Sequence, residues 1–145
     1  MSDPLLQTVV VPVASVEDAE STFAAALDRI AASDGRVVAV HVVEKGGGVP
    51  DKASVEQREE VGEEIFEVVE RACEDAGVAV ETRLEYGTDV AETIFDVADD
   101  VDATSIAFTP RGGSRWVRML TGDVTLSLVT ETDRPVVVLP DEDDE

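Results

Sequence analysis

Apolar residues follow two different spacings along the chain, and the change from one spacing to the other predicts alternating strands and helices. Short apolar and β-branched runs, typical of buried strands, occur at 9–13, 37–43, 104–108 and 135–139. The segment 78–86 alternates apolar with polar residues, which predicts an edge strand with one wetter face. Apolar residues at helical spacing predict four helices, at about 15–33, 52–76, 89–101 and 124–131.

Residues at the ends of the predicted helices support these boundaries. Ser15 and Asp18 have the spacing of a capping box, and Gly77 is a signal for a helix C-terminus. The second helix is amphipathic, and its wet face is rich in glutamate. Its predicted apolar face consists of Val61, Ile65, Val68, Ala72 and Ala76.

The order of these elements predicts the fold class. Because strands alternate with helices, the five strands are expected to form a parallel sheet with helices on both faces. The chain is therefore predicted to be an α/β, doubly wound single domain over residues 1–140, followed by an acidic C-terminal tail at 141–145. Such sheets bind ligands at the carboxyl ends of their strands, where the winding reverses.

The net charge of the chain restricts the kinds of molecule that it can bind. The chain has 33 acidic and 11 basic residues, with a net charge of −22. This surface repels nucleic acid and anionic lipid, so neither is an expected partner. Molar salt screens the self-repulsion, and the composition therefore indicates a halophilic protein. The alternative is an acidic protein that mimics DNA or binds a basic partner, but the acidic residues are spread over every predicted helix, which favours the first interpretation.

Other features of the sequence indicate the compartment. Cys73 is the only cysteine, so the chain cannot form a disulfide with itself. We find no apolar run of membrane-spanning length, and the first residues lack the pattern of a secretory signal. We expect a cytoplasmic protein.

Three stretches of the sequence resemble the universal stress proteins. They are Val9–Ser15, Gly87–Ile94 and the segment from Gly112 through Gly122 to Pro140, and together they extend over nearly the whole chain. With the acidic composition, the resemblance is to a haloarchaeal type. It implies a Rossmann-like sheet of order 3-2-1-4-5 and a homodimer that pairs through the last strand. The expected edge residues are Val136, Val137, Val138 and Leu139, and an unprotected apolar edge is itself a physical reason for such pairing.

ATP-binding members of that family carry a phosphate loop of glycine, two residues, glycine, nine residues, then glycine and a hydroxyl residue. Gly112 and Gly122 match the second and third glycines, with nine residues between them. Thr109 stands at the first glycine, and Asp123 stands at the hydroxyl position, where its carboxylate would repel phosphate. We expect Asp123 to cap the following helix and to fill the anion site itself. Ala14 replaces the aspartate that the family places against the ribose or adenine.

The same loop contains Arg111, Arg115 and Arg118, with Trp116 among them. The arginines are suited to hold an anion, and the indole is suited to stack on a base. Alternatively, the arginines pair with surface carboxylates and Trp116 packs under the loop or at the dimer contact. His41 is expected to be a core or strand-end histidine, Cys73 a small apolar residue, and the glycine run 46–48 a hinge.

The predicted function is that of a non-enzymatic stress-response or regulatory domain that acts as a dimer through contacts with an unknown protein partner. It is expected to need no cofactor and no metal. The alternative is a switch that binds ATP or AMP through Arg111 and Arg115, and a slow ATPase is a third interpretation. The pocket positions that the resemblance implies are Pro12, Val13, Ala14, Val42, Thr109, Arg111, Gly112, Gly122, Asp123, Val124 and Thr125.

Overall fold

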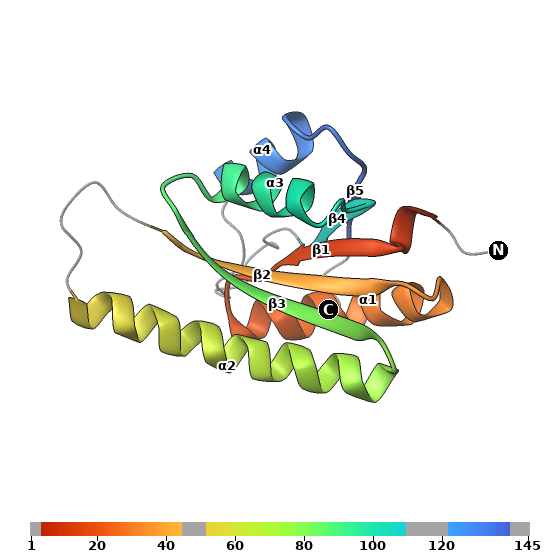
Figure 1. Ribbon diagram of the computed structural model, residues 1–145, viewed down its shortest axis with the longest axis horizontal. Helices are drawn as coiled ribbons and strands as arrows, with labels where there is room; N and C mark the ends of the chain where they lie inside the picture. Colours follow the sequence, from red (N-terminus) through yellow and green to blue (C-terminus); the bar gives the residue numbers. More distant parts are fainter. Residues whose placement is uncertain (1–3, 45–51, 110–121, 140–145) are drawn as a thin grey trace.

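The structure of the protein is a computed structural model that describes residues 4–44, 52–109 and 122–139. Its centre is a five-stranded parallel sheet of order β3-β2-β1-β4-β5, which confirms the predicted fold class and strand order (Figure 1). In chain order the elements are η1 Pro4–Leu6, β1 Thr8–Pro12, α1 Val16–Ala32, β2 Arg36–Glu44, α2 Lys52–Ala76, β3 Ala79–Gly87, α3 Val90–Asp100, β4 Ser105–Phe108, α4 Gly122–Thr130 and β5 Val136–Val138. The predicted tail at 141–145 and the glycine run at 46–48 lie outside the described residues.

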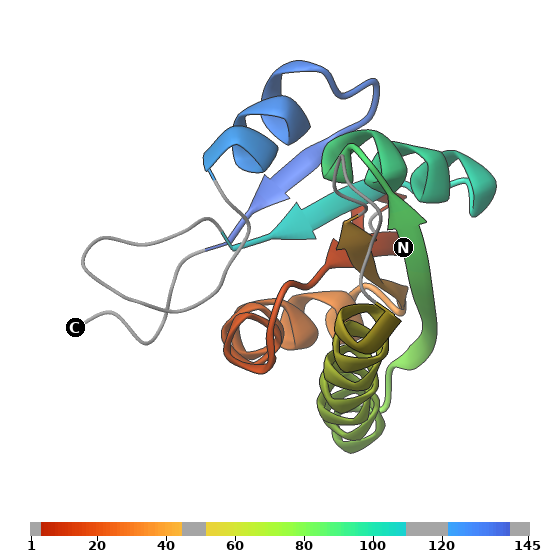
Figure 2. The same ribbon diagram turned by 90° about the vertical axis from the view of Figure 1, so that its left-hand side faces the viewer.

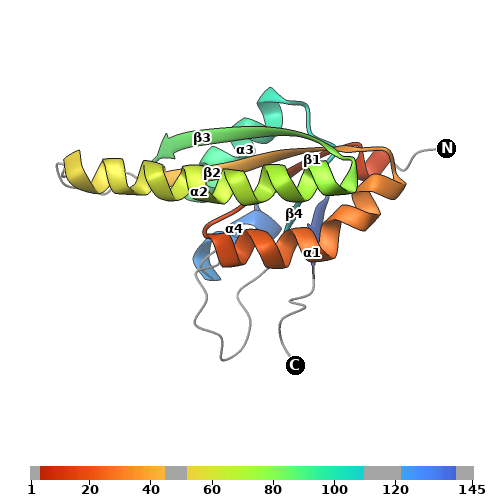
Figure 3. The ribbon, with the colours of Figure 1, turned by 90° about the horizontal axis from the view of Figure 1, so that it is seen from below.

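Helices cover both faces of the sheet. Figure 2 shows α1 and α2 on one face and α3 and α4 on the other, and Figure 3 shows α1 and α2 running side by side. The sheet is therefore doubly wound, as predicted. Because β1 connects to α1 on one face while β4 leads toward α4 on the other, the winding reverses between β1 and β4.

The central strands are buried on both faces, which explains their unbroken apolar runs. In β1, Val9 and Val11 pack in the core beneath α1 and α2, whereas Val10 packs in the core beneath α3 and α4. All three are 0% exposed. The alternation follows the two-residue period of a strand, and it assigns each neighbouring position to one face.

The buried face of α2 differs from the predicted one. Val61, which was predicted to face the core, is 41% exposed, so that prediction was wrong. A Cβ atom on Gly62 would lie 3.0 Å from Leu84 Cδ1 and 3.2 Å from His41 Cδ2, so the missing side chain lets the helix approach the sheet at Gly62 and leaves Val61 outside. Within residues 56–76 of α2, the buried residues are Gly62, Ile65, Val69 and Cys73.

The two edge strands carry different residues. On β3, the Arg83 side chain contacts Glu85 at 3.3 Å and Asp100 at 2.7 Å. On β5, Val138 is 54% exposed, and Leu139, beyond the end of the strand, is 4% exposed and belongs to the core. The Leu139 side chain is therefore part of the core beneath α1 and α2, and it is not exposed at the edge of the sheet beside β5.

Candidate functional site

The carboxyl ends of β1, β2 and β4 lie together at the point where the winding reverses. The hydrogen-bond ladder continues just past the strands: Val13 N–H donates to Val40 O at 2.9 Å, and Leu139 N–H donates to Phe108 O at 2.9 Å. The predicted pocket positions that the structure brings to this edge are Pro12, Val13, Ala14, Val42 and Thr109.

These positions divide between the two faces of the sheet. Val13 is buried in the core beneath α1 and α2, and Thr109 contacts α1 through Thr22. Ala14 and Val42, in contrast, are partly buried against the core beneath α3 and α4, and Val124 of α4 packs there with them. The partly exposed apolar surface at this edge therefore lies on the α3 and α4 face.

The remaining pocket positions are described only in part. Arg111 and Gly112 lie outside the described residues, as do Arg115, Trp116 and Arg118. The backbone of Gly122, Asp123 and Thr125 is helical, and α4 begins at Gly122. Asp123 therefore lies in the first turn of α4 and is not its N-cap residue, which corrects the prediction.

A buried polar cluster lies directly behind Thr109. The Asp18 side chain accepts a hydrogen bond from Ala14 N–H at 2.8 Å, while Ser15 Oγ accepts one from Asp18 N–H at 3.0 Å. The Thr22 hydroxyl lies 3.4 Å from Asp18 Oδ1 and 2.9 Å from the Thr109 hydroxyl. Ser15 and Asp18 thus form a variant of the predicted capping box, in which the carboxylate reaches Ala14 N–H rather than Ser15 N–H.

Asp18 is 1% exposed, and this burial has the largest effect on the pKa of its carboxyl. It raises the pKa of this carboxyl from 3.8 to about 7, because the anion loses its hydration. The bonds from Ala14 N–H and the Thr22 hydroxyl act in the opposite direction and lower the pKa. Asp18 therefore changes its charge near neutral pH, unlike an exposed aspartate.

His41 lies at the carboxyl half of β2 and is 9% exposed, as expected of a strand-end core histidine. Its Nδ1 lies 2.9 Å from Val13 O. A carbonyl oxygen can only accept, so Nδ1 carries the proton and donates. This side chain thereby fixes the end of β1 to β2, which assigns His41 a structural contact rather than a catalytic one.

With this geometry established, comparison with known proteins identifies the family. A model of the universal stress protein family matches residues 6–140. The chain belongs to the universal stress protein family. No curated protein gives a significant match.

Solved universal stress proteins have the same fold. A universal stress family protein from Burkholderia pseudomallei is 24% identical, with a TM-score of 0.76 over 94% of this chain and 97% of the other. The Archaeoglobus fulgidus universal stress protein in complex with dAMP is 22% identical, with a TM-score of 0.66 over 92% and 97%. An Arabidopsis thaliana family protein with AMP bound is 22% identical, with a TM-score of 0.68 over 92% and 91%. At these identities the comparison establishes the fold.

In this universal stress protein, the residue that sequence analysis aligned with the first glycine of the phosphate loop has a buried side chain. Thr109 is 0% exposed, and its hydroxyl contacts Thr22 on α1. A glycine could not make this contact. The end of β4 is therefore connected to α1 by a hydrogen bond between side chains.

Sequence analysis did not identify Asp18 and Thr22 as members of this site. Asp18 was interpreted only as a capping residue, and Thr22 was not singled out. The signal in the sequence is that the two polar residues are four apart, on the same face of a helix, beside the apolar residues Ala19 and Phe23. A carboxylate at such a position is buried, and it needs hydrogen-bond partners.

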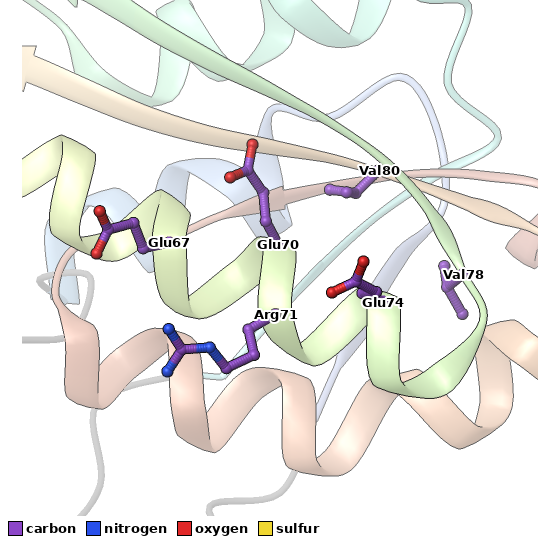
Figure 4. A pocket seen from close by; sticks show the side chains of 6 residues that line it. All are labelled: Glu67, Glu70, Arg71, Glu74, Val78 and Val80. Atoms are coloured by element: carbon purple, nitrogen blue, oxygen red, sulfur yellow. The ribbon is translucent and has the colours of Figure 1, made fainter.

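Other features of the described residues are less suited to bind a nucleotide or a metal ion. Figure 4 shows a surface hollow beside α2 and the start of β3, lined by Glu67, Glu70, Arg71, Glu74, Val78 and Val80. Three of these six residues are acidic, so the hollow is unfavourable for a nucleotide phosphate. Cys73 is fully buried, and burial raises the pKa of its thiol to about 11, so the thiol stays protonated. Within residues 4–44, 52–109 and 122–139, no group of acidic, histidine and cysteine side chains is arranged to hold a metal ion, and no helix is long and apolar enough for a membrane span.

Proposed function

We propose that this universal stress protein is a non-enzymatic stress-response domain that acts as a homodimer through protein contacts and binds ATP weakly or not at all. The observation that carries the proposal is the Thr109 side chain. It is buried and bonded to Thr22 at 2.9 Å, at the position where the family's phosphate loop has glycine. A backbone tied down by this side chain is less free to close around phosphates.

Residues at two further positions support the proposal that ATP binds weakly or not at all. Asp123 lies in the first turn of α4, where the family has a hydroxyl residue beside the phosphates. Two unit charges about 4 Å apart repel by roughly 1 kcal/mol in water and roughly 4 kcal/mol at an effective protein dielectric. Ala14 has no carboxylate to contact a ribose or adenine.

The absence of a catalytic group among the described residues of this edge supports a non-enzymatic role. Asp18 is buried and held by Ala14 N–H, and His41 donates to a backbone carbonyl. Neither side chain is paired with a nucleophile at hydrogen-bond distance, apart from the hydroxyl of Thr22, which lies inside the core.

The homodimer is proposed from the apolar edge at β5. Val138 of this strand is 54% exposed, and Leu126 and Val129 of α4 are 62% and 49% exposed. A three-residue apolar edge strand exposes unpaired backbone groups that a second copy can pair by two-fold symmetry.

Calorimetric titration with Mg-ATP at molar salt tests the nucleotide part of the proposal. We expect no micromolar binding by the wild type. The double substitution Thr109→Gly with Asp123→Ser restores the family's residues, and we expect it to strengthen ATP binding by about tenfold or more. Glu131→Ser, just beyond the other end of α4, removes the same charge and is the matched control. Micromolar binding of ATP by the wild type contradicts the proposal.

A second candidate is a switch that binds a nucleoside monophosphate. The solved structures with dAMP and AMP favour it, since the folds of those proteins match this chain. A monophosphate brings less negative charge toward Asp123 than a triphosphate does. Denaturing the purified protein and analysing the supernatant for AMP and ATP distinguishes the two functions, because only the second candidate predicts a retained nucleotide.

A further inference from the structure

A continuous series of hydrogen-bonded groups crosses the carboxyl edge of the sheet, from β2 to β4. It begins at His41, passes through the peptide group between Val13 and Ala14, and reaches Asp18 on α1. From Asp18 it continues through the Thr22 hydroxyl to the Thr109 hydroxyl. The members come from β2, the end of β1, α1 and the end of β4, so the series joins the segments that meet where the winding reverses.

The peptide group between Val13 and Ala14 is held from both sides. Its oxygen accepts from His41 Nδ1 at 2.9 Å, and its N–H donates to Asp18 Oδ2 at 2.8 Å. Hydrogen bonds in such a series polarise one another, so a change of charge on Asp18 alters the bond that His41 makes. All four side chains of the series are at most 9% exposed, and water therefore screens this coupling weakly.

Few groups face the Asp18 carboxyl. On its own helix the facing group is the Thr22 hydroxyl, and from the end of β1 it is Ala14 N–H. Ser15 Oγ contacts the backbone N–H of Asp18 and not its carboxyl. From β4, Thr109 acts through Thr22, and from β2, His41 acts through the peptide group. Among the described residues, no charged side chain adds to the causes that set its pKa, which are burial and these two hydrogen bonds. The N-terminus of α1 favours the anion, and burial favours the neutral acid.

We propose that this series is a proton-responsive relay, in which one proton taken up by Asp18 reverses the direction of the hydroxyl hydrogen bonds that end at Thr109. When Asp18 is ionised, Thr22 donates to the carboxylate and Thr109 donates to Thr22. When Asp18 binds a proton from solvent at Oδ1, the carboxyl donates to Thr22, and Thr22 donates to Thr109. The Thr109 proton then turns to another acceptor. No other bond forms or breaks, and each hydroxyl keeps one proton.

The relay ends at a defined group. Thr109 is the last described residue before the segment 110–121, and the relay sets the hydrogen-bonding state of its hydroxyl. The relay does not depend on nucleotide binding, so its test and the test of the proposed function are separate. It is a conformational device of the fold, sensitive to pH between the ionised and neutral forms of one buried carboxyl.

Nuclear magnetic resonance at fixed molar salt tests the relay in the full chain. The Asp18 side-chain carboxyl carbon is expected to titrate with a midpoint near pH 7. The backbone amide signals of Ala14 and Thr109 are expected to follow the same midpoint. Thr22→Val removes the connecting hydroxyl: Asp18 should still titrate, at a higher midpoint because one stabilising bond to the anion is lost, while the Thr109 response disappears.

Asp18→Asn and Glu20→Gln complete the experiment. The amide introduced by Asp18→Asn can accept from Ala14 N–H and donate to Thr22, so it reproduces the neutral acid, and both responses should vanish while the fold is kept. Glu20 is exposed on the same helix, and Glu20→Gln should leave both responses unchanged. A Thr109 signal that does not change through the Asp18 titration, or one that changes equally in Thr22→Val, overturns the proposal.

Discussion

The two edges of the sheet differ in length, charge and exposure. β3 has nine residues, and Arg83 at its centre pairs with Glu81, Glu85 and the Asp100 carboxylate of α3. β5 has three residues, all of them valine, and no charge. Charged side chains along an edge strand oppose pairing with another chain, whereas a short apolar edge does not. The molecule therefore protects one edge and leaves the other available to a second copy.

The helices beside the two edges differ in the same way. α2 packs beside β3 and has nine acidic and three basic residues among its 25. α4 lies near β5 and has one acidic residue among its nine, with Leu126 and Val129 exposed. A surface with so much negative charge repels another copy of itself, and a surface without it does not. This difference between α2 and α4 is what the proposed homodimer through β5 requires.

The largest expected effect comes from a charge placed on the apolar edge. In a two-fold dimer through β5, Val138→Asp enters twice and brings like charges together in a desolvated contact. We expect the dimer dissociation constant to rise by about a thousandfold or more, since like charges at an interface cost several kcal/mol. Analytical ultracentrifugation over a concentration series at molar salt measures it.

The matched control lies on the opposite edge. Ala79 is exposed on β3, and Ala79→Asp adds the same charge there. We expect it to leave the dimer intact. Equal weakening by both substitutions, or a wild type that is monomeric throughout the series, contradicts the assignment of β5 as the pairing edge.

Asp18 lies on neither edge strand, so a substitution there tests folding stability separately from dimer formation. The folded-state pKa of Asp18 is about 7 and its unfolded value is 3.8, so the folded protein binds this proton more tightly. Stability therefore falls as the pH rises from 3.8 to about 7, and the cost is fully present above that. Asp18→Asn removes it, and we expect a gain in unfolding free energy that grows over this window to at most about 4 kcal/mol.

Urea unfolding of Asp18→Asn and wild type at several pH values measures the difference, which cancels the contribution of the other carboxylates. Glu20→Gln is the control, because it removes one exposed charge from the same helix. Dimer dissociation should not change with Asp18→Asn, since the hydrogen-bond partners of Asp18 are Ala14, Ser15 and Thr22, none of which lies on an edge strand. A difference that stays flat with pH excludes a buried carboxyl that titrates near neutral pH.

The elements and their order could be predicted because their signals are local. The helical spacing at 52–76 predicted α2 with its observed ends, and the alternation at 78–86 predicted the edge strand β3 to within one residue. The apolar face of α2 was predicted less well. Val61 fits the helical spacing, but the close approach at Gly62 depends on Leu84 and His41 in other strands, which helical spacing does not reveal.

The site shows the same limit. The resemblance located Thr109 and Ala14 at the carboxyl edge of the sheet, where the structure has them. The partner of the Thr109 hydroxyl is Thr22, which is 87 residues away in sequence. The pKa of Asp18 depends mainly on burial, which is a property of the assembled core. Residue type and spacing predicted the cap, and tertiary packing determined that the capping residue is also a buried acid.

The smallest expected effect concerns the acidic side of the comparison. Glu60 on α2 is exposed, with Glu56 and Glu64 one turn away on either side. Like charges at this spacing cost roughly 0.2–0.5 kcal/mol per pair, so Glu60→Gln should stabilise the protein by roughly 0.5–1 kcal/mol at low salt. At molar salt the Debye length is about 3 Å, and the gain should vanish. Glu20→Gln, which has one acidic neighbour a turn away, Glu17, should show a smaller dependence on salt. If the two variants respond to salt alike in thermal unfolding, the repulsion is a property of the total charge. In that case the number of acidic residues on α2 does not by itself distinguish the β3 side of the molecule from the β5 side.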